Sequence, residues 1–465
     1  MTKFTFARMA AVSALALMVA GAAHAESLAD AIAMAYANNP TLARARASQR
    51  ATDETYVQTR AQLGPSLGAD ASTTYADHSD FPGTAGSNSY TSVGLSANQT
   101  LFASGGIAAS VNASKSSVLA GQQDLRSTES GVLLDVIGVY TAVYRDQQAL
   151  QISQDNYDIL KQQLDQTQAQ FDAGQLTRTD VAQSQARLSA SAAGLASAQA
   201  QLDTDRASYV AVVGQAPVAL DAVPDLPGLP ADFNAALNTA QTNNPDLQAA
   251  HFAEDSAKSH LKAAKSVFGP TVSLSASTGE SAPTNHLGLL SDAESTQATL
   301  RLSIPLFSAG LNGSRVRQAS ETYSAQQSTT EITRRSVVSQ VSQAWSQMLA
   351  AKSSVASTQD EVKAAQVAAE GVKTEQQVGL RTNIEVLNAE QELKSAQLDL
   401  VNAQRGQYVA AAQLLAVMGN LTAQTFDPSI QLYDPNKHFD QVKNKGWTPL
   451  EPVVQALDGL AAGTH

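Results

Sequence analysis

The chain contains no cysteine among its 465 residues, and aromatic residues make up only 5% of it. Without a thiol it can form no disulfide framework, thiolate metal site, cysteine nucleophile or lipidated-cysteine anchor. It has no basic stretch to offset a formal net charge of -12, which argues against nucleic-acid binding because phosphate is repelled. No internal apolar run reaches the roughly 18 residues of a membrane-spanning helix. No P-loop, zincin signature, nucleophile elbow or dinucleotide fingerprint is present, so we predict no enzyme and no cofactor.

The first 25 residues differ in character from the rest of the chain. Lys3 and Arg8 precede an apolar run over 10–23, and small residues at 23 and 25 frame a cleavage site before Glu26. This order is typical of a secretory signal peptide, and the run is too short for the alternative, a membrane anchor. We therefore predict a signal peptide at 1–25 and an exported mature chain.

The remaining sequence is an internal duplication with a constant offset. Three motifs recur 205 residues apart, namely Asn38-Asn39-Pro40 with Asn243-Asn244-Pro245, Gly64-Pro65 with Gly269-Pro270, and Leu101-Phe102 with Leu306-Phe307. Chance matches would scatter in offset. We predict two tandem repeats, residues 26–220 and 232–425, joined by a Pro-rich linker at 221–231.

Both repeats show the same predicted order of elements. A helical stretch ends at the Gly-Pro pair, where the apolar period changes to the two-residue period of strands. Heptad-like apolar stripes then predict coiled-coil helices, the first of roughly 65 residues or about 100 Å. The predicted elements are β-hairpins at about 64–105 and 269–310, long helices at 104–173 and 309–376, and shorter helices at 177–214 and 382–419. The tail at 426–465 has no counterpart and no sustained periodicity, so we predict that it is mobile.

The four predicted strands are apolar on one face and long enough for the roughly 9 to 11 residues of a tilted membrane strand. Four strands cannot close a membrane barrel, whose smallest forms have about eight, so several chains must contribute. The alternative is a small soluble sheet capping a helical bundle, against which the signal peptide, the duplication and the long helices argue. Tyr75, Tyr90, Phe102 and Phe307 lie near strand ends, where aromatic residues anchor at membrane interfaces or simply pack.

The motifs, in this order and present twice, resemble the TolC family of outer-membrane channel proteins over residues 26–425. The strongest likeness lies in two segments that resemble the family's turns between coiled-coil helices, Gly174-Gln175-Leu176-Thr177-Arg178-Thr179-Asp180-Val181 and Gly379-Leu380-Arg381-Thr382-Asn383-Ile384-Glu385-Val386-Leu387-Asn388-Ala389. The resemblance implies an α+β fold of mainly long coiled-coil helices. It further implies a homotrimer with a twelve-stranded β-barrel in the lipid of the outer membrane, four strands per chain, continued by a twelve-helix α-barrel across the periplasm of a Gram-negative bacterium.

The resemblance also assigns roles near these turns, because in the family polar links close the periplasmic end. Matching by motif position places Arg381 opposite Thr179 and Asp180 as a latch, a charge-assisted link that a partner can break. It points Glu385 and Asn388 toward the pore, where three copies of Glu385 would form an acidic ring favouring cations. The alternative for each residue is an exposed polar group on a helix surface.

At two positions of the predicted tip the chain departs from the family pattern, and six turn residues are expected to contact a partner. The family often has an aromatic residue where this chain has Gln376 and a second aspartate where it has Asn388, so a weaker latch and ring are expected. The turn residues expected to dock a periplasmic adaptor are Gly174, Leu176, Thr177, Gly379, Leu380 and Thr382.

The function implied by the resemblance is a passive exit duct. An inner-membrane ABC transporter and its periplasmic adaptor, a membrane fusion protein, would dock at the tip and open the latch. The absence of a lipidated cysteine and the turn at 171–181 favour type I secretion of a protein cargo over the alternative, efflux of small toxic molecules. A structural or adhesive coiled-coil protein is the alternative of another class, but such proteins rarely show two equal halves with a hairpin in each.

Four other residues have a simpler interpretation. His251 and Glu254 have the spacing of a helical metal pair, but no third ligand is apparent, so no metal site is predicted. Tyr140 and Trp345 occupy equivalent positions of the apolar stripe in the two repeats, and we expect both to be packing residues.

Overall fold

The computed structural model describes residues 25–78, 86–217, 219–283 and 293–462. The predicted signal peptide therefore lies outside the described residues, except for Ala25. In the first repeat the elements are α1 (Leu28–Asn38), α2 (Pro40–Arg60), a 3-10 turn (Ala61–Leu63), β1 (Ser66–His78), β2 (Gly86–Phe102), α3 (Gly106–Asp172) and α4 (Arg178–Val213). In the second they are α5 (Phe233–Asn243), α6 (Pro245–Ser266), β3 (Thr271–Pro283), β4 (Ala293–Ser303), α7 (Leu311–Gln377) and α8 (Asn383–Val417).

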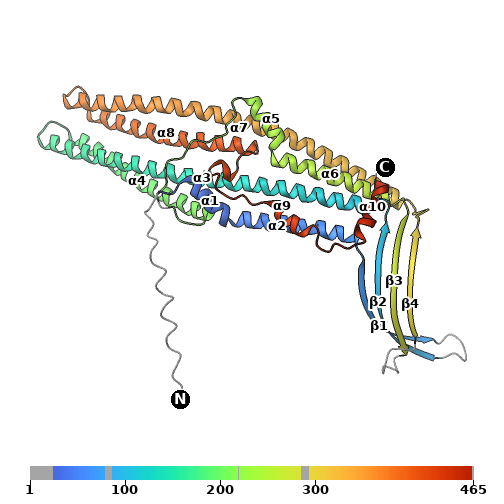
Figure 1. The fold of residues 1–465 in the computed structure, drawn as a ribbon. Coiled ribbons are helices and arrows are strands. Elements are labelled where there is room, and N and C mark those ends of the chain that lie inside the picture. The colour runs from blue at the N-terminus through green and yellow to red at the C-terminus, as the bar shows by residue number, and fades with distance from the viewer. Residues whose placement is uncertain (1–24, 79–85, 218, 284–292, 463–465) are drawn as a thin grey trace, which may run out of the picture.

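The same elements in the same order confirm the two tandem repeats (Figure 1). The long helices α3 and α7 have 67 residues each, which corresponds to about 100 Å. They run from the sheet at one end of the molecule to two helix-turn-helix tips at the other (Figure 1). None of the helices in the described ranges combines the length and apolarity that crossing a bilayer requires.

The Asn-Asn-Pro motif ties the first two helices of each repeat to its last helix. Asn39 caps α2 by accepting from the Thr41 amide at 2.8 Å, and its side-chain amide donates to the carbonyl of Val212 at 3.0 Å. Its equivalent, Asn244, accepts from the Leu247 amide at 3.0 Å and donates to the carbonyl of Val417 at 2.9 Å. The asparagine is thus both a helix cap and a tertiary link, in both halves.

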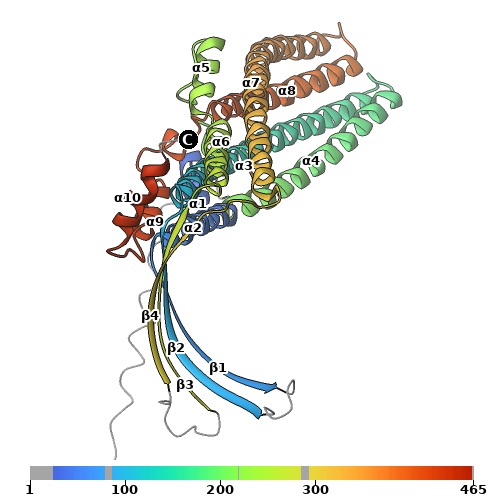
Figure 2. The ribbon, with the colours of Figure 1, turned by 90° about the vertical axis from the view of Figure 1, so that its right-hand side faces the viewer.

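The four strands form one antiparallel sheet in the order β1-β2-β3-β4, in which β2 and β3 join the two repeats. Register places apolar side chains on one face, and they are Leu67, Ala69, Ala71, Val93, Leu95, Ala97, Leu274, Ala276, Leu300 and Leu302. The opposite face is polar and carries Ser66, Asp70, Ser92, Ser96, Asn98, Ser275, Ser277, Gln297 and Arg301. Within the described ranges, the outer edges of β1 and β4 have no strand partner. The strands curve away from the helices (Figure 2).

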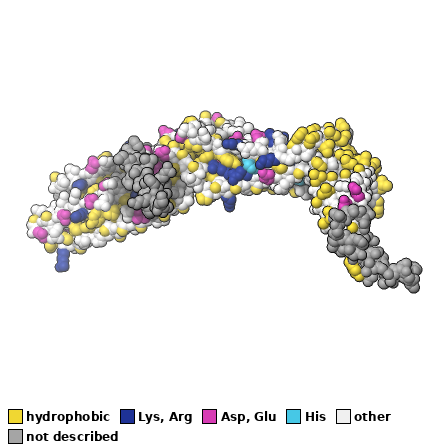
Figure 3. All heavy atoms as spheres, turned by 60° about the horizontal axis from the view of Figure 1, so that its bottom comes forward, with side chains coloured by type: hydrophobic (Ala, Val, Ile, Leu, Met, Phe, Trp, Pro, Cys, Tyr) yellow, Lys and Arg dark blue, Asp and Glu magenta, His cyan; other side chains and the backbone are white. Residues whose placement is uncertain are grey.

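The apolar face of the sheet is open to solvent in the single chain. Leu67 is 82% exposed, Leu95 60% and Leu300 67%. Hydrophobic side chains gather over this end of the molecule, whereas the helical part is mixed in character (Figure 3). An uncovered apolar surface of this kind marks an interaction with lipid or with another chain.

The aromatic residues predicted near strand ends divide into three cases. Tyr75 is 67% exposed and Phe307 90% exposed, whereas Phe102 is half-buried. The side chain of Tyr90 lies outside the part of the molecule that the structure describes.

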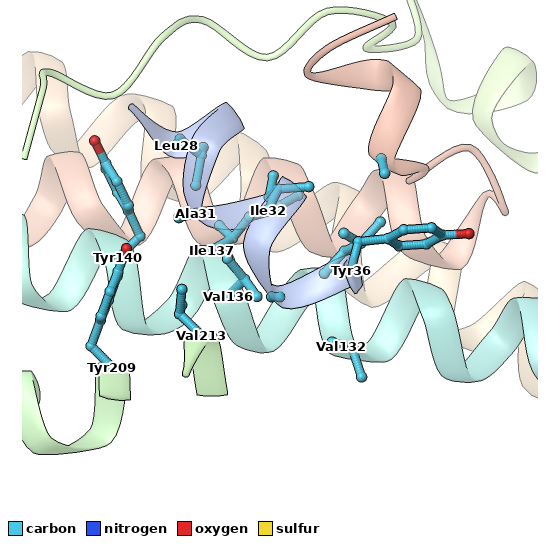
Figure 4. Packing of buried hydrophobic residues seen from close by; sticks show 14 of the residues in the cluster. Leu28, Ala31, Ile32, Tyr36, Val132, Val136, Ile137, Tyr140, Tyr209 and Val213 are labelled. Carbon is cyan, nitrogen blue, oxygen red and sulfur yellow. The ribbon is translucent and has the colours of Figure 1, made fainter. Parts of the chain in front are cut away.

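The main core lies midway along the helices, where α1 packs on α3 and α4 and where α8 contributes Ala412 and Leu415 to the same cluster (Figure 4). Leu28 and Ile32 of α1 are fully buried there together with Tyr140 of α3. A second cluster around Val341 contains Trp345, which is partly buried. The prediction that Tyr140 and Trp345 are packing residues is therefore confirmed.

The tail at 426–465, which the sequence predicts to be mobile, contacts the first repeat. It contains two helices, α9 (Pro435–Val442) and α10 (Glu451–Ala462), and a 3-10 turn (Ala423–Thr425) precedes it. His438 of α9 contacts the buried carboxylate of Asp53 at 2.8 Å, and Glu451 of α10 forms an ion pair with Arg60. The tail is held by polar contacts to the first repeat, which leave no periodic pattern in the sequence.

Asp458 provides the tail's deepest contact, because its side chain is 0% exposed. Its carboxylate accepts from the backbone amides of Ala103, Gly105 and Ala108 at 2.7, 2.9 and 3.0 Å. These amides belong to the junction between β2 and α3 and lack partners within the helix. The C-terminal helix thus caps the first long helix.

Candidate functional site at the helical tips

The two predicted turns form the end of the molecule opposite the sheet, one between α3 and α4 and the other between α7 and α8 (Figure 1). Gly174 and Gly379 end the long helices with φ of 77° and 80°, values that favour glycine. In both turns the next amide reaches back to the helix, from Gln175 to the Gln170 carbonyl and from Leu380 to the Glu375 carbonyl, each at 2.9 Å. This is the Schellman arrangement, and it reverses the chain within a few residues.

The following helices begin with a reciprocal cap. The carboxylate of Asp180 accepts from the Thr177 amide at 3.0 Å and from its hydroxyl at 2.7 Å. Glu385 does the same for Thr382, at 2.8 and 2.7 Å. Threonine followed three residues later by an acidic residue is the sequence pattern of a capping box. Four of the predicted site residues therefore have a structural role in starting α4 and α8.

These hydrogen bonds favour the ionised carboxylates. The contacts from the Thr177 side chain and backbone lower the pKa of Asp180. Hydrogen bonds from the Thr382 backbone and side chain, followed by the one from Arg381, lower the pKa of Glu385 to about 2. Both tips therefore carry charged carboxylates at any physiological pH.

Arg381 lies between two carboxylates of its own turn. Its guanidinium donates to Glu375 at 2.7 Å and to Glu385 at 2.9 Å. Within the described part of one chain, no hydrogen bond or ion pair joins Arg381 to Thr179 or Asp180. The predicted latch contact is thus not formed inside a single chain, because acidic residues six positions before and four positions after Arg381 are closer partners.

Asn388 connects the two halves of the tip instead of standing free. Its side-chain oxygen accepts from the guanidinium of Arg187 at 2.8 Å, which links α8 to α4. The bond is exposed to solvent. Arg187 was not among the predicted site residues.

The predicted docking turns present apolar side chains to solvent. Leu380 is 75% exposed and the neighbouring Val378 70% exposed, whereas Leu176 is half-buried. The second tip thus offers two highly exposed apolar side chains beside an exposed ion-pair cluster, while the first tip offers Phe171, which is 37% exposed, and the half-buried Leu176.

A buried polar network just behind the tips escaped the sequence prediction. Asn383 accepts from the Gln163 side chain at 2.9 Å and donates to the Ser184 hydroxyl at 2.9 Å. Thr167 lies 3.3 Å from Ser184, and all four side chains are buried. The network joins α3, α4 and α8, and therefore binds the second repeat to the first.

The sequence contains one indication of this network. The residues equivalent to Gln163, Thr167 and Ser184 in the second repeat are Ala368, Val372 and Ala389, which are all apolar. Polar residues replace apolar ones in one repeat only, at positions that face a neighbouring helix.

His251 and Glu254, for which no metal site is predicted, lie on α6. His251 is exposed, and the described residues contain no group of three or more potential ligands arranged for a metal ion.

Known proteins resemble this chain in both sequence and fold. The model of the family "Outer membrane efflux protein" matches residues 31–215 and 236–420, two segments related by the same offset as the repeats. The outer membrane efflux protein BepC of Brucella suis is 31% identical over 429 residues, covering 91% of this chain and 92% of that protein. The alkaline protease secretion protein AprF of Pseudomonas aeruginosa is 26% identical, covering 65% of this chain and 64% of that protein. A crystal structure of CusC shares the fold, with a TM-score of 0.76 at 19% identity over 85% of this chain and 92% of that one.

Proposed function

This chain belongs to the outer membrane efflux protein family, and on that premise we propose that it is the exit duct of a tripartite export system. It is a channel protein of the Gram-negative outer membrane with a long periplasmic portion, and the resemblance to the TolC family is confirmed. The finer proposal is that three copies assemble and that the main cargo is a protein secreted by a type I system.

The four-stranded sheet is the observation that supports the proposed exit duct most strongly. It has an exposed apolar face, a polar face and two edges, β1 and β4, that are unpaired in the part of the chain that the structure describes. Pairing β4 of one copy with β1 of the next would close twelve strands in three copies, with leucines toward lipid and serines toward water. The 67-residue helices would continue this barrel as a tunnel of about 100 Å across the periplasm.

We place the gate at the helical tips. Three chains would bring Arg381 of one copy near Thr179 and Asp180 of another, and Arg381 would then exchange its partners Glu375 and Glu385 for Asp180. Glu385 and Asn388 would line the constriction. The buried network around Asn383 would hold α8 against the first repeat in the closed state, so opening requires that these bonds break.

Docking partners would bind the turns. An adaptor that covers Leu380 and Val378 would bury apolar surface now in water, while its polar groups replace the exposed ion pairs. The inner-membrane ABC transporter would supply the energy, because nothing in this chain suggests an energy-consuming site.

Secretion is supported by the relative AprF, whose name records protease secretion, and by the absence of a lipidated cysteine. The first test compares proteins in the culture medium with and without the gene. Loss of one secreted protein, restored by complementation, is the expected result. An unchanged medium would contradict secretion as the main role.

Small-molecule efflux is the second candidate, favoured by the relative BepC, which is named an efflux protein. The same deletion strain would then show increased sensitivity to drugs and detergents with an unchanged medium. Conductance of the purified protein in a lipid bilayer separates both candidates from a structural coiled-coil protein, since only a duct makes a stable pore.

A cross-linked gate tests the mechanism in the same strain. Because Ser184 and Asn383 are in contact and the chain has no cysteine, Ser184→Cys with Asn383→Cys would connect α4 to α8 under oxidation. We expect export to stop under oxidation and to resume with reductant, and each single variant is the control. Export that continues through the cross-linked protein would contradict this gate.

A further inference from the structure

Glu26, the residue that follows the predicted signal peptide, is built into the core. It is 8% exposed and forms an isolated parallel bridge with Leu220 of the inter-repeat linker. Its amide donates to the Ala219 carbonyl at 2.6 Å, and its carbonyl accepts from the Asp221 amide at 3.0 Å. Both the amide and the carbonyl of the first residue of the predicted mature chain are thus hydrogen-bonded to the segment 219–221.

Two fully buried tyrosines hold the same residue. The Tyr140 hydroxyl lies 2.9 Å from the carbonyl oxygens of both Glu26 and Asp221. The Tyr209 hydroxyl donates to the Glu26 carboxylate at 2.6 Å. The two tyrosines lie next to each other at the Leu28 end of α1 (Figure 4).

The second repeat shows that these groups are not required by the fold. The positions equivalent to Tyr140 and Tyr209 are Trp345 and Leu414, and the position equivalent to Glu26 is Ala231. The helix that follows nevertheless begins in the same way, with Ser27 capping α1 and Asp232 capping α5. The hydroxyls and the carboxylate therefore belong to the chain start and not to the repeat.

The Glu26 carboxylate lacks a partner for its charge. Its second oxygen is buried without a hydrogen bond, and within the described ranges no basic side chain forms an ion pair with Glu26. An ionised carboxylate buried in this way is unfavourable unless a cation accompanies it.

We propose that removal of the signal peptide after Ala25 supplies this cation and completes a buried docking site for the mature N-terminus. Hydrolysis of the Ala25–Glu26 bond consumes one water, leaves a carboxylate on the departing Ala25 and gives Glu26 an α-ammonium group. That nitrogen keeps its bond to Ala219 and gains two further N–H groups and a positive charge, a few bonds from the unpartnered oxygen. Ala25, on the other side of the cleaved bond, is only half-buried.

The consequence is that processing and folding are coupled. A chain that retains its leader would bury the carboxylate without its cation, so the junction of α1, α3, α4 and the linker would be less stable. The fully stable core would therefore form only after export and cleavage.

The test uses the full mature protein. Intact-mass measurement should give Glu26 as the first residue, and an amine-selective N-terminal reagent such as 2-pyridinecarboxaldehyde should label the folded protein at least about tenfold more slowly than the protein in urea. A mature chain that begins elsewhere, or equal labelling rates in the two states, would overturn the proposal.

Two variants separate the charge from mere crowding. Insertion of Ser-Gly between Ala25 and Glu26 moves the ammonium away, and we expect a lower midpoint of thermal unfolding and a loss of labelling protection. In the Glu26→Ala background the same insertion should have less than about half of that effect, since no carboxylate remains to be compensated. An insertion that leaves the midpoint unchanged, or that acts equally in both backgrounds, would refute the ammonium–carboxylate pair.

Discussion

Glu385 of the second tip makes two kinds of contact. Its carboxylate caps α8 by accepting from Thr382, and it also accepts a hydrogen bond from Arg381. Its pKa of about 2 lies below the ordinary value of about 4.3. A lowered pKa in the folded state means that the stabilisation is fully present above about pH 4.3 and is lost as the pH falls through about 2.

We therefore expect the hydrogen-exchange protection of the first turn of α8, after correction for intrinsic rates, to be complete above about pH 4.3, to decline gradually below it and to be lost entirely only below about pH 2. Glu385→Gln is the matched control, because glutamine also serves in a capping box but does not titrate. Protection that is lost near pH 4.3 in the wild type would contradict the lowered pKa.

Asn383 is the residue whose loss should affect the gate most. Asn383→Ala leaves the side-chain amide of Gln163 buried without its acceptor and removes one of the bonds of Ser184, which costs about 1 to 3 kcal/mol. We expect a leaky channel, measured as higher conductance in planar bilayers and greater sensitivity to large antibiotics. Gln168→Ala is the control, since among the described residues the side chain of Gln168 bonds to Asp172 of the same helix, at the surface. Equal conductance of the two variants would show that the network does not hold the gate.

Single-residue roles at the tip could be predicted only where they depend on local sequence. The capping pattern at Thr177 and Thr382 is visible in the sequence, because a cap involves residues three positions apart. The partners of Arg381 and the burial of Asn383 were not predictable. The side chain of Arg381 has several rotatable bonds and can reach more than one carboxylate. Asn383 contacts helices whose residues are about 200 positions away in the chain.

At the scale of elements, the two tip turns depend on glycine for backbone reasons alone. Gly174 has positive φ, and a Cβ placed there would meet no atom within 4 Å. Gly174→Ala should therefore destabilise the tip by about 1 to 2 kcal/mol through strain, whereas Gly174→Asn should be tolerated.

Gly371 lies inside helix α7 and provides a control, because its replacement by alanine should change stability in the opposite direction. It also has open space around it, so Gly371→Ala should stabilise the helix by up to about 1 kcal/mol. Hydrogen exchange of the tip segments compares the three variants, and a Gly174→Ala tip as protected as the wild type would argue against the strain.

The C-terminal helix α10 should act as a clamp on the start of α3. Asp458→Ala removes the acceptor of three amides, and we expect a loss of about 2 to 4 kcal/mol of local stability. Hydrogen exchange over residues 103–108 should increase, while the equivalent start of α7 stays unchanged as an internal control. Asp458→Asn should lie between the two because it keeps one acceptor oxygen. No change at 103–108 would rule out the clamp.

Elements with a sustained period were predictable to within a few residues. The predicted long helices at 104–173 and 309–376 correspond to α3 (Gly106–Asp172) and α7 (Leu311–Gln377), because apolar stripes at three- and four-residue spacing mark their packed faces. The tail was not predictable in this way. Its ion pair between Arg60 and Glu451 joins residues 391 positions apart, and α9 and α10 are too short to show a repeated stripe.

At the scale of the whole molecule, the unpaired edges of the sheet predict a closed assembly. The absence of cysteine allows a direct test, because a cysteine on β1 and another on β4 can form only engineered bonds. We expect Ser72→Cys, combined in turn with Gln297→Cys, Thr299→Cys or Arg301→Cys, to give a covalent trimer in at least one pair after oxidation. Several positions are needed because one chain does not fix the register between copies.

The single Ser72→Cys variant controls for random collisions, and the trimer should disappear with reductant. A ladder of open oligomers would indicate that the edges pair without closing. The absence of a cross-link in every pair would contradict pairing between β4 and β1.

The unequal tips have a consequence for stoichiometry. The first tip presents the half-buried Leu176, whereas the second presents the exposed Leu380 and the ion pairs of Arg381. A ring of three such chains would display six tips of two alternating kinds. A partner that recognises only one kind would bind with a valence of three, and a partner that tolerates both would bind with a valence of six. In such a ring, the divergence of a duplicated sequence would set how many partners a symmetric rim can hold.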